Sequence, residues 1–394
     1  MGMVIRRLVI VLALGHVLCA VSPAATYRVG PGEKYTKVSE VAERLKTGDV
    51  VEITGDISDV FTLTANGTAD KPVVIRGITN VENGRIVRPR ITPPSVPCAS
   101  VITCRGDWTV LEGLDISGQT GTGKGESAVV QQCGDLVVRN CRIHHNARAF
   151  WGVPEMAGNA LIEFCEFDSN GKGAPSLVNV ISGRAEAKGV VQFCYFHDDI
   201  AGGALRCWVD NVAIRYNWFE NPYWFAVRVA NAPFPNTEEG ADKASMILPS
   251  HCDIVGNVFM SGLAANYPFS LISVGGEGSQ STGTEGDFNI AHNLFVARRG
   301  GVAPSVQIIA LGNIDRINVV NNVFLEWGLI RGCMVYERGE TYDCPRTLRF
   351  QKARGSPDPI LTGSNNWISA SAYGVPPEFE NTLSGVDPLF ADLP

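Results

Sequence analysis

One ten-residue pattern occurs four times in the middle of the chain, and this repeat constrains the fold more than any other feature. The four stretches are VVRNCRIHHN, LIEFCEFDSN, VVQFCYFHDD and VAIRYNWFEN, which begin at Val137, Leu161, Val190 and Val212. Each contains alternating apolar residues, then Cys or Asn, then Phe or Ile two positions later. Alternation with a period of two predicts β-strands, and self-similarity at this spacing predicts stacked units rather than a compact sandwich.

The Cys or Asn position recurs along most of the chain. Successive occurrences are separated by 23 to 44 residues, and they are Leu114, Cys141, Cys165, Cys194, Asn217, Asn257, Asn293, Asn322 and Asn366. A unit of this size holds three short strands, and equivalent strands of successive units pair at about 4.8 Å. We therefore expect three parallel sheets, with strands at 203–208 and 212–216 and a third from Trp218 in one unit. The Cys or Asn would point inward at a bend, followed by an inward Phe or Ile.

This arrangement resembles the right-handed parallel β-helix superfamily of pectate-lyase-like proteins, whose bends carry stacked asparagines. The resemblance covers residues 27 to about 390. It implies an all-β fold, namely a single-stranded right-handed parallel β-helix, or three-sheet solenoid, with an N-terminal capping helix. The stretch KYTKVSEVAERLKTGD would supply that helix, because Val38, Val41 and Leu45 share one helical face and Gly48 follows as a stop.

The first 25 residues have the pattern of a secretory signal peptide. Arg6 and Arg7 precede an apolar run at 8–20, and small residues follow. The run is too short for a comfortable membrane span. We therefore expect a signal peptide at 1–25 and a single β-helix domain at 26–394. The mature protein would be secreted or periplasmic, with no integral membrane segment.

Charge and cysteine content bear on the partners and the covalent structure. The formal net charge is −7, and it becomes −9 when the two arginines of the signal are removed. An acidic chain disfavours nucleic-acid binding. Cysteines can pair in an oxidising compartment, and Cys333 with Cys344 is the best candidate disulfide. We expect a monomer.

A local basic patch is predicted on the first strands of three consecutive units. Outward residues there form a column of Asn179, Arg206 and Arg228, and Arg184 and Lys188 follow in the turn after Asn179. Two guanidinium groups about 4.8 Å apart repel unless an anion lies between them. The column therefore predicts an anion site, although acids from the long insertion after Arg228 would neutralise the pair equally well.

Tryptophans lie on or next to the same strands, at Trp151, Trp208 and Trp224. Aromatic faces stack on sugar rings and arginine forks bind carboxylates, so the combination suits an acidic polysaccharide. Long insertions after Arg228 and Val274 would form one wall of a groove along the solenoid. The alternative is that these tryptophans only pack loops.

A second outward column is predicted on the third strands. Imidazoles there suit proton transfer near neutral pH or metal binding, and the next residues, Asp198 and Asp199, are suitable ligands for a hard ion such as Ca²⁺. The other interpretation is an ordinary solvated face. The column comprises His144, Asp168, His197 and Glu220.

The stretch GGALRCWVDNVAIRYNWF at 202–219 resembles the polysaccharide lyase family that holds chondroitinase B and many alginate lyases. In that family an Arg at the end of a first strand and a Lys one coil earlier do the acid and base work, while Ca²⁺ neutralises the substrate carboxylate. Arg206 matches the Arg position. The Lys position holds no Lys here, so Lys188 would have to substitute from three or four residues further on, and Cys207 replaces the His of the family's Arg-His-Gly signature.

These features predict a polysaccharide lyase that cleaves an acidic, uronate-containing glycan by β-elimination, with Ca²⁺ as a candidate cofactor. Arg206 and Arg228 would neutralise the C6 carboxylate, and Lys188 or His197 would remove the C5 proton. The predicted substrate contacts are Asn179, Arg184, Trp208, Trp224, Trp151 and His144.

Two alternatives stay open. One is a β-helix glycoside hydrolase of an acidic polysaccharide, which needs two carboxylates flanking the bond, and Asp198, Asp199 and Glu220 are the candidates. The other is a non-catalytic carbohydrate-binding or surface protein, because β-helices often only display a surface.

Overall fold

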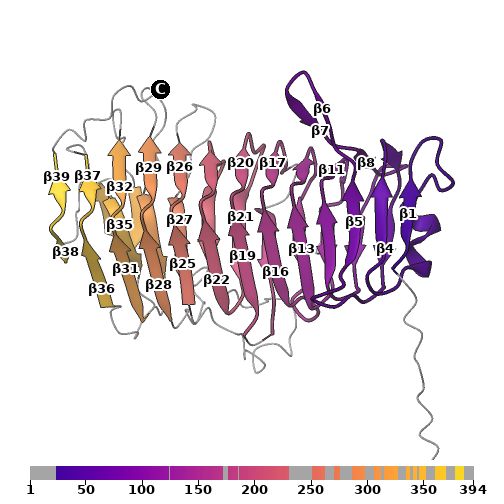
Figure 1. The fold of residues 1–394 in the computed structure, drawn as a ribbon. Coiled ribbons are helices and arrows are strands. Elements are labelled where there is room, and N and C mark those ends of the chain that lie inside the picture. Colours follow the sequence, from indigo (N-terminus) through magenta and orange to yellow (C-terminus); the bar gives the residue numbers. More distant parts are fainter. Residues whose placement is uncertain are drawn as a thin grey trace, which may run out of the picture.

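The chain forms a right-handed parallel β-helix, in which three long sheets run along one axis (Figure 1). This confirms the predicted fold class. The computed structural model describes residues 24–385 except 124, 172–175, 185, 230–250, 262–269, 276–285, 298–305, 312–314, 327–333, 338–339, 344–345, 352–359 and 370–377. The predicted signal peptide and the Cys333–Cys344 pair fall outside the described residues.

Three parallel sheets, here named A, B and C, contain the strands in the following order. Sheet A holds β1 (Thr26–Val29), β2 (Val50–Ile53), β5 (Val73–Gly77), β10 (Thr109–Glu112), β13 (Asp135–Arg139), β16 (Asn159–Glu163), β19 (Lys188–Gln192), β22 (Asn211–Arg215), β25 (His251–Val255), β28 (Asp287–Ala291), β31 (Arg316–Val320), β36 (Ile360–Ser364) and β38 (Phe379–Glu380). Sheet B holds β3 (Ile57–Ser58), β8 (Arg90–Thr92), β11 (Asp115–Ser117), β14 (Arg142–His144), β17 (Glu166–Asp168), β20 (Tyr195–His197), β23 (Trp218–Glu220), β26 (Val258–Ser261), β29 (Leu294–Ala297), β32 (Val323–Glu326), β37 (Trp367–Ile368) and β39 (Leu383–Ser384). Sheet C holds β4 (Phe61–Leu63), β9 (Ser100–Cys104), β12 (Ser127–Gln131), β15 (Phe150–Gly152), β18 (Ser176–Ile181), β21 (Gly203–Trp208), β24 (Phe225–Val229), β27 (Ser270–Gly275), β30 (Val306–Leu311) and β35 (Arg346–Gln351).

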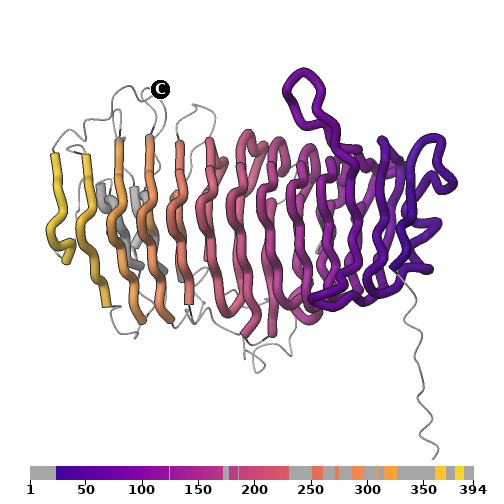
Figure 2. The backbone as a smooth tube through the Cα atoms, in the orientation of Figure 1, coloured from indigo at the N-terminus to yellow at the C-terminus, as the bar shows by residue number. Residues whose placement is uncertain are grey.

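Each complete coil passes from sheet C to sheet A and then to sheet B, and the coils follow one another along the axis (Figure 2). The unit read from the sequence is confirmed, because β21, β22 and β23 begin and end within one residue of the predicted strands. Two antiparallel pairs lie outside these sheets, β6 (Asn80–Glu82) with β7 (Arg85–Val87) and β33 (Met334–Glu337) with β34 (Glu340–Asp343). The first pair projects from the solenoid (Figure 1).

The bend between sheets A and B carries the predicted inward ladder. Asn257 is typical: its Oδ1 accepts from the backbone N–H of Asn217 at 2.9 Å, and its Nδ2 donates to the carbonyl of Ile214 at 2.9 Å. Earlier coils use thiols instead, and Cys194 Sγ donates to the carbonyl of Gln192 at 3.2 Å. Because bent backbone leaves buried polar groups without strand partners, these side chains satisfy them and fix the bend.

Two residues after the ladder, an inward ring repeats from coil to coil. Phe167, Phe196 and Phe219 are buried and stack with centroids 4.8 and 4.7 Å apart. The stack continues through Phe259, Phe295 and Phe324. Both inward columns were predicted from the repeat. The eight cysteines in the described part of the chain are all buried and unpaired, which is consistent with their use as small core side chains.

The N-terminal cap differs from the predicted α-helix. It consists of two 3₁₀ turns, η1 (Val38–Glu40) and η2 (Ala42–Arg44), which pack against β4. Val38, Val41 and Leu45 are buried as expected, and they belong to the main core. The β-branched valines disfavour a longer helix, and the Asp59 carboxylate holds the first turn by accepting from the N–H of Ser39 at 2.9 Å.

Outward side chains of sheet A alternate in charge along six coils. The register places Arg28, Glu52, Arg76, Glu112, Arg139 and Glu163 in one column. Arg76 and Glu112 approach to 3.4 Å, and Arg139 and Glu163 to 3.6 Å. No helix in the described part of the chain is long and apolar enough to cross a bilayer.

Candidate functional site

The outward column predicted on sheet C is confirmed by the strand register. Asn179 pairs with Arg206, and Arg206 pairs with Arg228, on β18, β21 and β24. The column continues from Trp151 on one side to Ser273 on the other. The two guanidinium side chains therefore start from neighbouring strands and from the same face of the solenoid.

A shared aromatic ring orders the two arginines. The Arg228 guanidinium lies 4.5 Å from the centroid of Phe225, and that of Arg206 lies 5.8 Å from the same centroid. Arg206 also lies 4.9 Å from the ring of Trp208. Gly203 makes this arrangement possible, since a Cβ at that position would fall 2.1 Å from Phe225 Cζ. Cation–π contacts of this kind hold a guanidinium plane in one orientation.

Much of the column is buried, which the sequence did not predict. Asn179 is 0% exposed and Arg206 is 8% exposed, whereas Arg228 and Trp208 are partly exposed. Trp151 is also buried and packs against the Arg148 guanidinium at 4.6 Å. The accessible part of this face is therefore Arg228 together with Trp208, which lies two residues after Arg206 on β21.

The other residues predicted for this face are distributed around it. Lys188 does not lie in a turn: it is the first residue of β19 on sheet A, it is exposed, and its N–H donates to Asn159 Oδ1 at 2.9 Å. Arg184 is in the turn, but its guanidinium donates to the carbonyl of Met156 at 2.7 Å, toward earlier coils. Trp224 is exposed just before β24.

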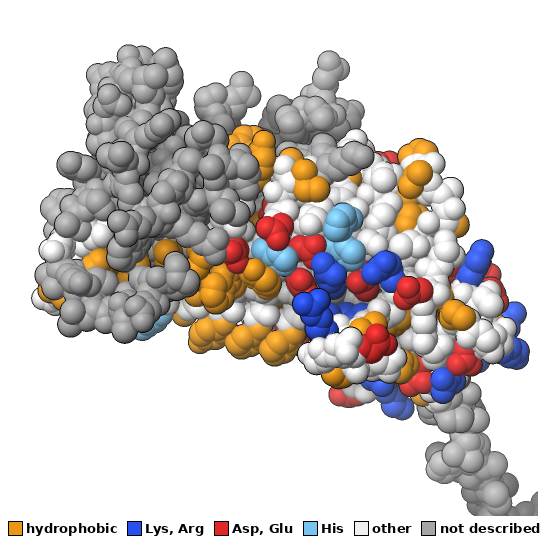
Figure 3. All heavy atoms as spheres, turned by 90° about the horizontal axis from the view of Figure 1, so that it is seen from above, with side chains coloured by type: hydrophobic (Ala, Val, Ile, Leu, Met, Phe, Trp, Pro, Cys, Tyr) orange, Lys and Arg blue, Asp and Glu red, His pale blue; other side chains and the backbone are white. Residues whose placement is uncertain are grey.

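Sheet B carries the predicted column of titratable side chains, but it is a connected network rather than a row of solvated groups. His144, Asp168 and His197 are in register. Arg142 lies among the carboxylates and donates to Asp168 at 2.8 Å, with Glu166 at 3.6 Å. Figure 3 shows histidines, acids and bases gathered on this face, with hydrophobic side chains next to them.

His197 lies between two carboxylates. Its Nε2 is 3.2 Å from Glu166 Oε1 and its Nδ1 is 2.8 Å from Asp198 Oδ2. Burial favours the neutral imidazole, but the bonds to Glu166 and Asp198 outweigh it and raise the pKa of His197 to about 9. The bond to His197 in turn lowers the pKa of Glu166. His197 is therefore a cation at neutral pH, which suits it to donate a proton rather than to remove one.

A second histidine chain runs beside it. Asp115 Oδ1 lies 2.8 Å from His144 Nε2, and His144 Nδ1 lies 2.7 Å from Nδ1 of the exposed His145. Burial opposes the charge of Asp115, but the bond to His144 and the nearby arginines lower its pKa. The chain therefore leads from a buried carboxylate to an exposed imidazole, and it is suited to proton transfer.

Calcium does not fit either face as the described residues stand. Asp199 is buried with one carboxyl oxygen lacking a partner among the described residues, and burial raises its pKa, which disfavours the charged carboxylate that Ca²⁺ would need. The groups of possible ligand atoms that converge within 4.8 Å are His144, His145 and Asp168, and Glu166, Asp168 and His197. Both contain imidazoles, and Arg142 already neutralises Asp168, whereas Ca²⁺ requires a shell of oxygens. Asp198 bonds to His197 instead.

Sequence reasoning missed an aromatic strip at the bend between sheets A and B. Phe164, Phe193 and Tyr216 each precede the ladder residue of their coil, and all three are exposed. The signal was present in the sequence as FC, FC and YN at the bend, where later coils have Gly256 or His292. The strand pattern alone does not distinguish these outward aromatic residues from inward ones.

The fold and the two faces define a class of protein, the right-handed parallel β-helix, and solved structures of that class are similar to this chain over most of its length. A PL6 family polysaccharide lyase from Pseudopedobacter saltans is 14% identical, with 89% of this chain and 93% of that chain covered and a TM-score of 0.52. An alginate lyase from Paenibacillus sp. str. FPU-7 is 13% identical, with 78% and 99% covered and a TM-score of 0.44. A mannuronic acid specific family 6 lyase from human gut microbiota is 14% identical, with 93% and 92% covered and a TM-score of 0.43.

No protein-family model and no curated protein matches the sequence. At such identities the likeness shows the fold, and the fold hosts many activities. Activity has to be argued from the site.

Proposed function

We propose that this protein is a polysaccharide lyase that cleaves a uronate-containing glycan by β-elimination on the face of sheet C. The observation that carries the proposal is the pairing of Arg206 and Arg228 on neighbouring strands against one ring, that of Phe225. Guanidinium groups bind carboxylates with paired hydrogen bonds, and a planar ring beside them suits a sugar face. The similar solved structure from Pseudopedobacter saltans is named as a polysaccharide lyase, which agrees with a polysaccharide as the class of substrate.

Each residue has one step in the proposed reaction. Arg228 binds and neutralises the C6 carboxylate, which makes the C5 proton acidic, and the buried Arg206 beside it adds positive charge at the same place. A base removes that proton, the electron pair forms the C4–C5 double bond, and the C4–O bond breaks as the leaving oxygen takes a proton from water. Two arginines take the place that Ca²⁺ holds in the resembling family, so the elimination has no metal step here.

Lys188 is the proposed base. It begins β19 directly after the corner that joins sheet C to sheet A, and β21 ends at the equivalent corner with Trp208. His197 is assigned no step on this face, because it lies on sheet B and is a cation at neutral pH. Its paired carboxylates make it part of the sheet B network instead.

Non-catalytic binding of an acidic glycan is the second candidate, and one observation favours it. The described part of the sheet C column contains no carboxylate, imidazole or tyrosine beside the arginines, from Thr62 through Trp151 and Asn179 to Ser273. The hydrolase alternative has weaker support, since Asp199 is buried and Glu220 accepts the hydroxyl of Tyr195 at 2.5 Å.

The test is to incubate the protein with alginate, pectate and chondroitin sulfate and to follow both the ultraviolet absorbance of unsaturated ends and the release of reducing ends. A lyase produces both, a hydrolase only the second, and a binder neither. Arg228→Ala should lower the elimination rate by about 10²-fold or more. Arg215→Ala is the matched control, because Arg215 is a half-exposed arginine of sheet A that pairs with Asp253.

Two outcomes would contradict the proposal: no absorbance with any uronate glycan, or full activity in Arg228→Ala. Full activity in Lys188→Met is a third informative outcome, and it would remove only the assignment of the base. Secretion is part of the proposal as well, and sequencing the N-terminus of the exported protein should find a start near residue 26.

A further inference from the structure

Five aromatic side chains are exposed together within three consecutive coils, on the bend between sheets A and B and away from the sheet C face. Their exposed fractions are 37 to 55%, and they are Phe164, Phe193, Tyr195, Tyr216 and Trp218. Exposed apolar surface of this size on a solenoid with a polar exterior marks a place where something binds.

The strip on the sheet A side is regular. Phe164 and Phe193 lie with centroids 5.0 Å apart and planes 6° apart, and Phe193 and Tyr216 with centroids 5.3 Å apart and planes 13° apart. Across the bend, Tyr195 and Trp218 form a second pair, with centroids 6.3 Å apart. The strip therefore runs along the solenoid axis in steps set by the coil spacing.

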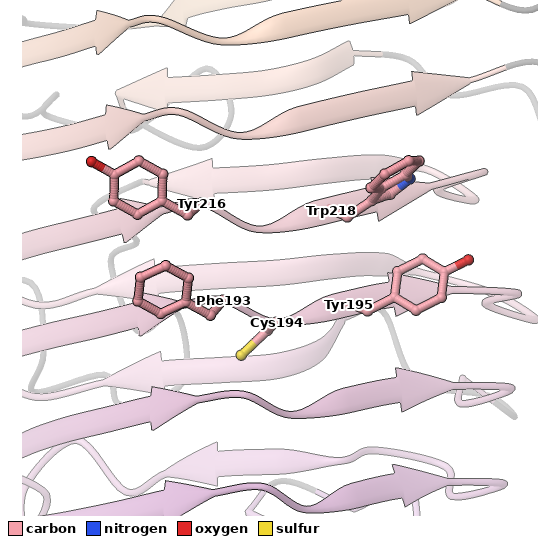
Figure 4. Close-up of a pocket in the computed structure, with 5 residues that line it drawn as sticks. All are labelled: Phe193, Cys194, Tyr195, Tyr216 and Trp218. Carbon is pink, nitrogen blue, oxygen red and sulfur yellow. The ribbon is translucent and has the colours of Figure 1, made fainter. Parts of the chain in front are cut away.

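A hollow lies between the pair of Phe193 and Tyr216 and the pair of Tyr195 and Trp218. It has a volume of about 440 Å³, and it is lined by Phe193, Cys194, Tyr195, Tyr216 and Trp218. Figure 4 shows Phe193 and Tyr216 on one side of the bend and Tyr195 and Trp218 on the other. A ligand that enters from outside therefore meets aromatic surface on both sides of the bend.

Backbone conformation indicates that these rings are not there for stability alone. Phe164, Phe193 and Tyr216 all have left-handed backbone, with φ of 54, 55 and 56°. Left-handed conformation is unfavourable for bulky side chains and is tolerated best by Gly and Asn. The equivalent bend position holds Asn140 before this region and Gly256 after it. The three central coils thus keep aromatic residues at positions where strain opposes them, which is typical of binding sites.

Polar groups lie at the rim of the hollow. The Tyr195 hydroxyl donates to Glu220 at 2.5 Å, and the Tyr195 ring stacks on His197 at 4.1 Å. Aromatic floors with a few polar groups at the edge match the two surfaces of a sugar, whose C–H faces are apolar and whose hydroxyl edges are polar. A lipid or an apolar peptide would not use the carboxylate and imidazole at this rim.

We propose that this hollow and strip bind a glycan chain that lies along the solenoid axis, at a second site distinct from the arginine pair of sheet C. Each step of the strip presents one ring to one sugar. The site holds the polysaccharide and performs no chemistry, so a long chain can engage both faces of one molecule. Two linked contacts raise the apparent affinity for long chains well above that for short ones.

The test uses the full chain and a double variant, Phe193→Asn with Tyr216→Asn. Asn occupies the same left-handed bend position at 140, 321 and 365, so the variant is expected to fold. Calorimetric titration with hexasaccharides of alginate, pectate, chondroitin sulfate, cellulose and mannan should show binding of at least one, weakened about tenfold or more in the variant. His292→Asn, at the equivalent bend of a distant coil, is the matched control and should bind like the wild type.

The outcome is independent of the lyase proposal, because Arg228→Ala should abolish elimination and leave this binding intact. Binding that survives the double variant in an Arg228→Ala background, where the sheet C site is also removed, overturns the second site, as does binding of none of the hexasaccharides. A wild type that sediments as a dimer while the double variant sediments as a monomer also overturns it, since the strip would then be an interface between two copies. Thermal unfolding of both variants checks that a loss of binding is not a loss of fold.

Discussion

Raising the pH through the neutral to alkaline range should destabilise this protein through one residue, His197. Its imidazole lies between Glu166 and Asp198, and its pKa is raised from 6.5 to about 9. A folded-state pKa above the unfolded value means that the native state binds the proton more tightly. The stabilisation is therefore complete below pH 6.5 and is lost as the pH rises through about 9.

The size of the effect follows from the shift. Each pKa unit corresponds to about 1.4 kcal/mol, so the change at His197 amounts to about 3 kcal/mol of unfolding free energy. The His197 side chain is 15% exposed, but the carboxylates of Glu166 and Asp198 are 36% and 64% exposed, so solvent screens both pairs and about 3 kcal/mol is the upper bound. A loss of this size is a large fraction of the stability of an ordinary domain.

The assay is urea unfolding at a series of pH values, followed by circular dichroism, for the wild type and His197→Gln. Gln has no charge to lose. The unfolding free energy of the wild type should therefore fall by up to about 3 kcal/mol relative to that of the variant as the pH rises from below 6.5 to above about 9. His251→Gln is the matched control, since His251 forms an ion pair with Asp253 at 3.2 Å but is half exposed, and such pairs contribute little. Parallel pH profiles for wild type and His197→Gln would refute the reasoning.

Three further predictions concern the scaffold. Asn257→Ala should lower the free energy of unfolding in urea by about 3 kcal/mol, because a buried carbonyl and a buried N–H lose their partners. Asn257→Cys should lower it less, because thiols fill this position in earlier coils. Equal losses for the two variants would contradict the role given to the ladder. Gly203→Ala should lower the melting temperature by displacing the Phe225 ring, and the loss should largely vanish in a Phe225→Ala background, whereas additive losses would mean that the two do not interact. Arg142→Met should destabilise the folded protein by about 3 kcal/mol, because it leaves the buried Asp168 without its ion pair. Arg76→Met, which removes an exposed ion pair, should be nearly neutral in the same thermal unfolding experiment.

The inward half of this fold could be predicted from the sequence because its signal is local and repeated. An alternation with a period of two fixes which residues face the core, and the ladder position fixes where the chain bends. Asn217 and Phe219 lie where the pattern places them. The sheet C column was predictable for the same reason, since Asn179, Arg206 and Arg228 occupy one position of a repeat.

The outward half was predicted less well because neighbours on that surface come from different coils. Lys188 was placed in a turn, since the sequence does not show where β19 begins. Arg206 is buried, although its column is expected to be open, and Arg142 lies between two carboxylates. Both features depend on contacts between residues of different coils, which are 23 to 44 residues apart in the sequence. Periodicity predicts the direction of a side chain but not what covers it.

The alternating Arg and Glu column on sheet A has a consequence for assembly. A strand that skipped one coil, within a chain or by exchange with a second copy, would set Arg28 against Arg76 and Glu52 against Glu112. Like charges opposite each other on neighbouring strands are unfavourable. Among these six coils, a register that skips a single coil is therefore disfavoured, whereas the order along the chain keeps every neighbour in the column opposite in sign.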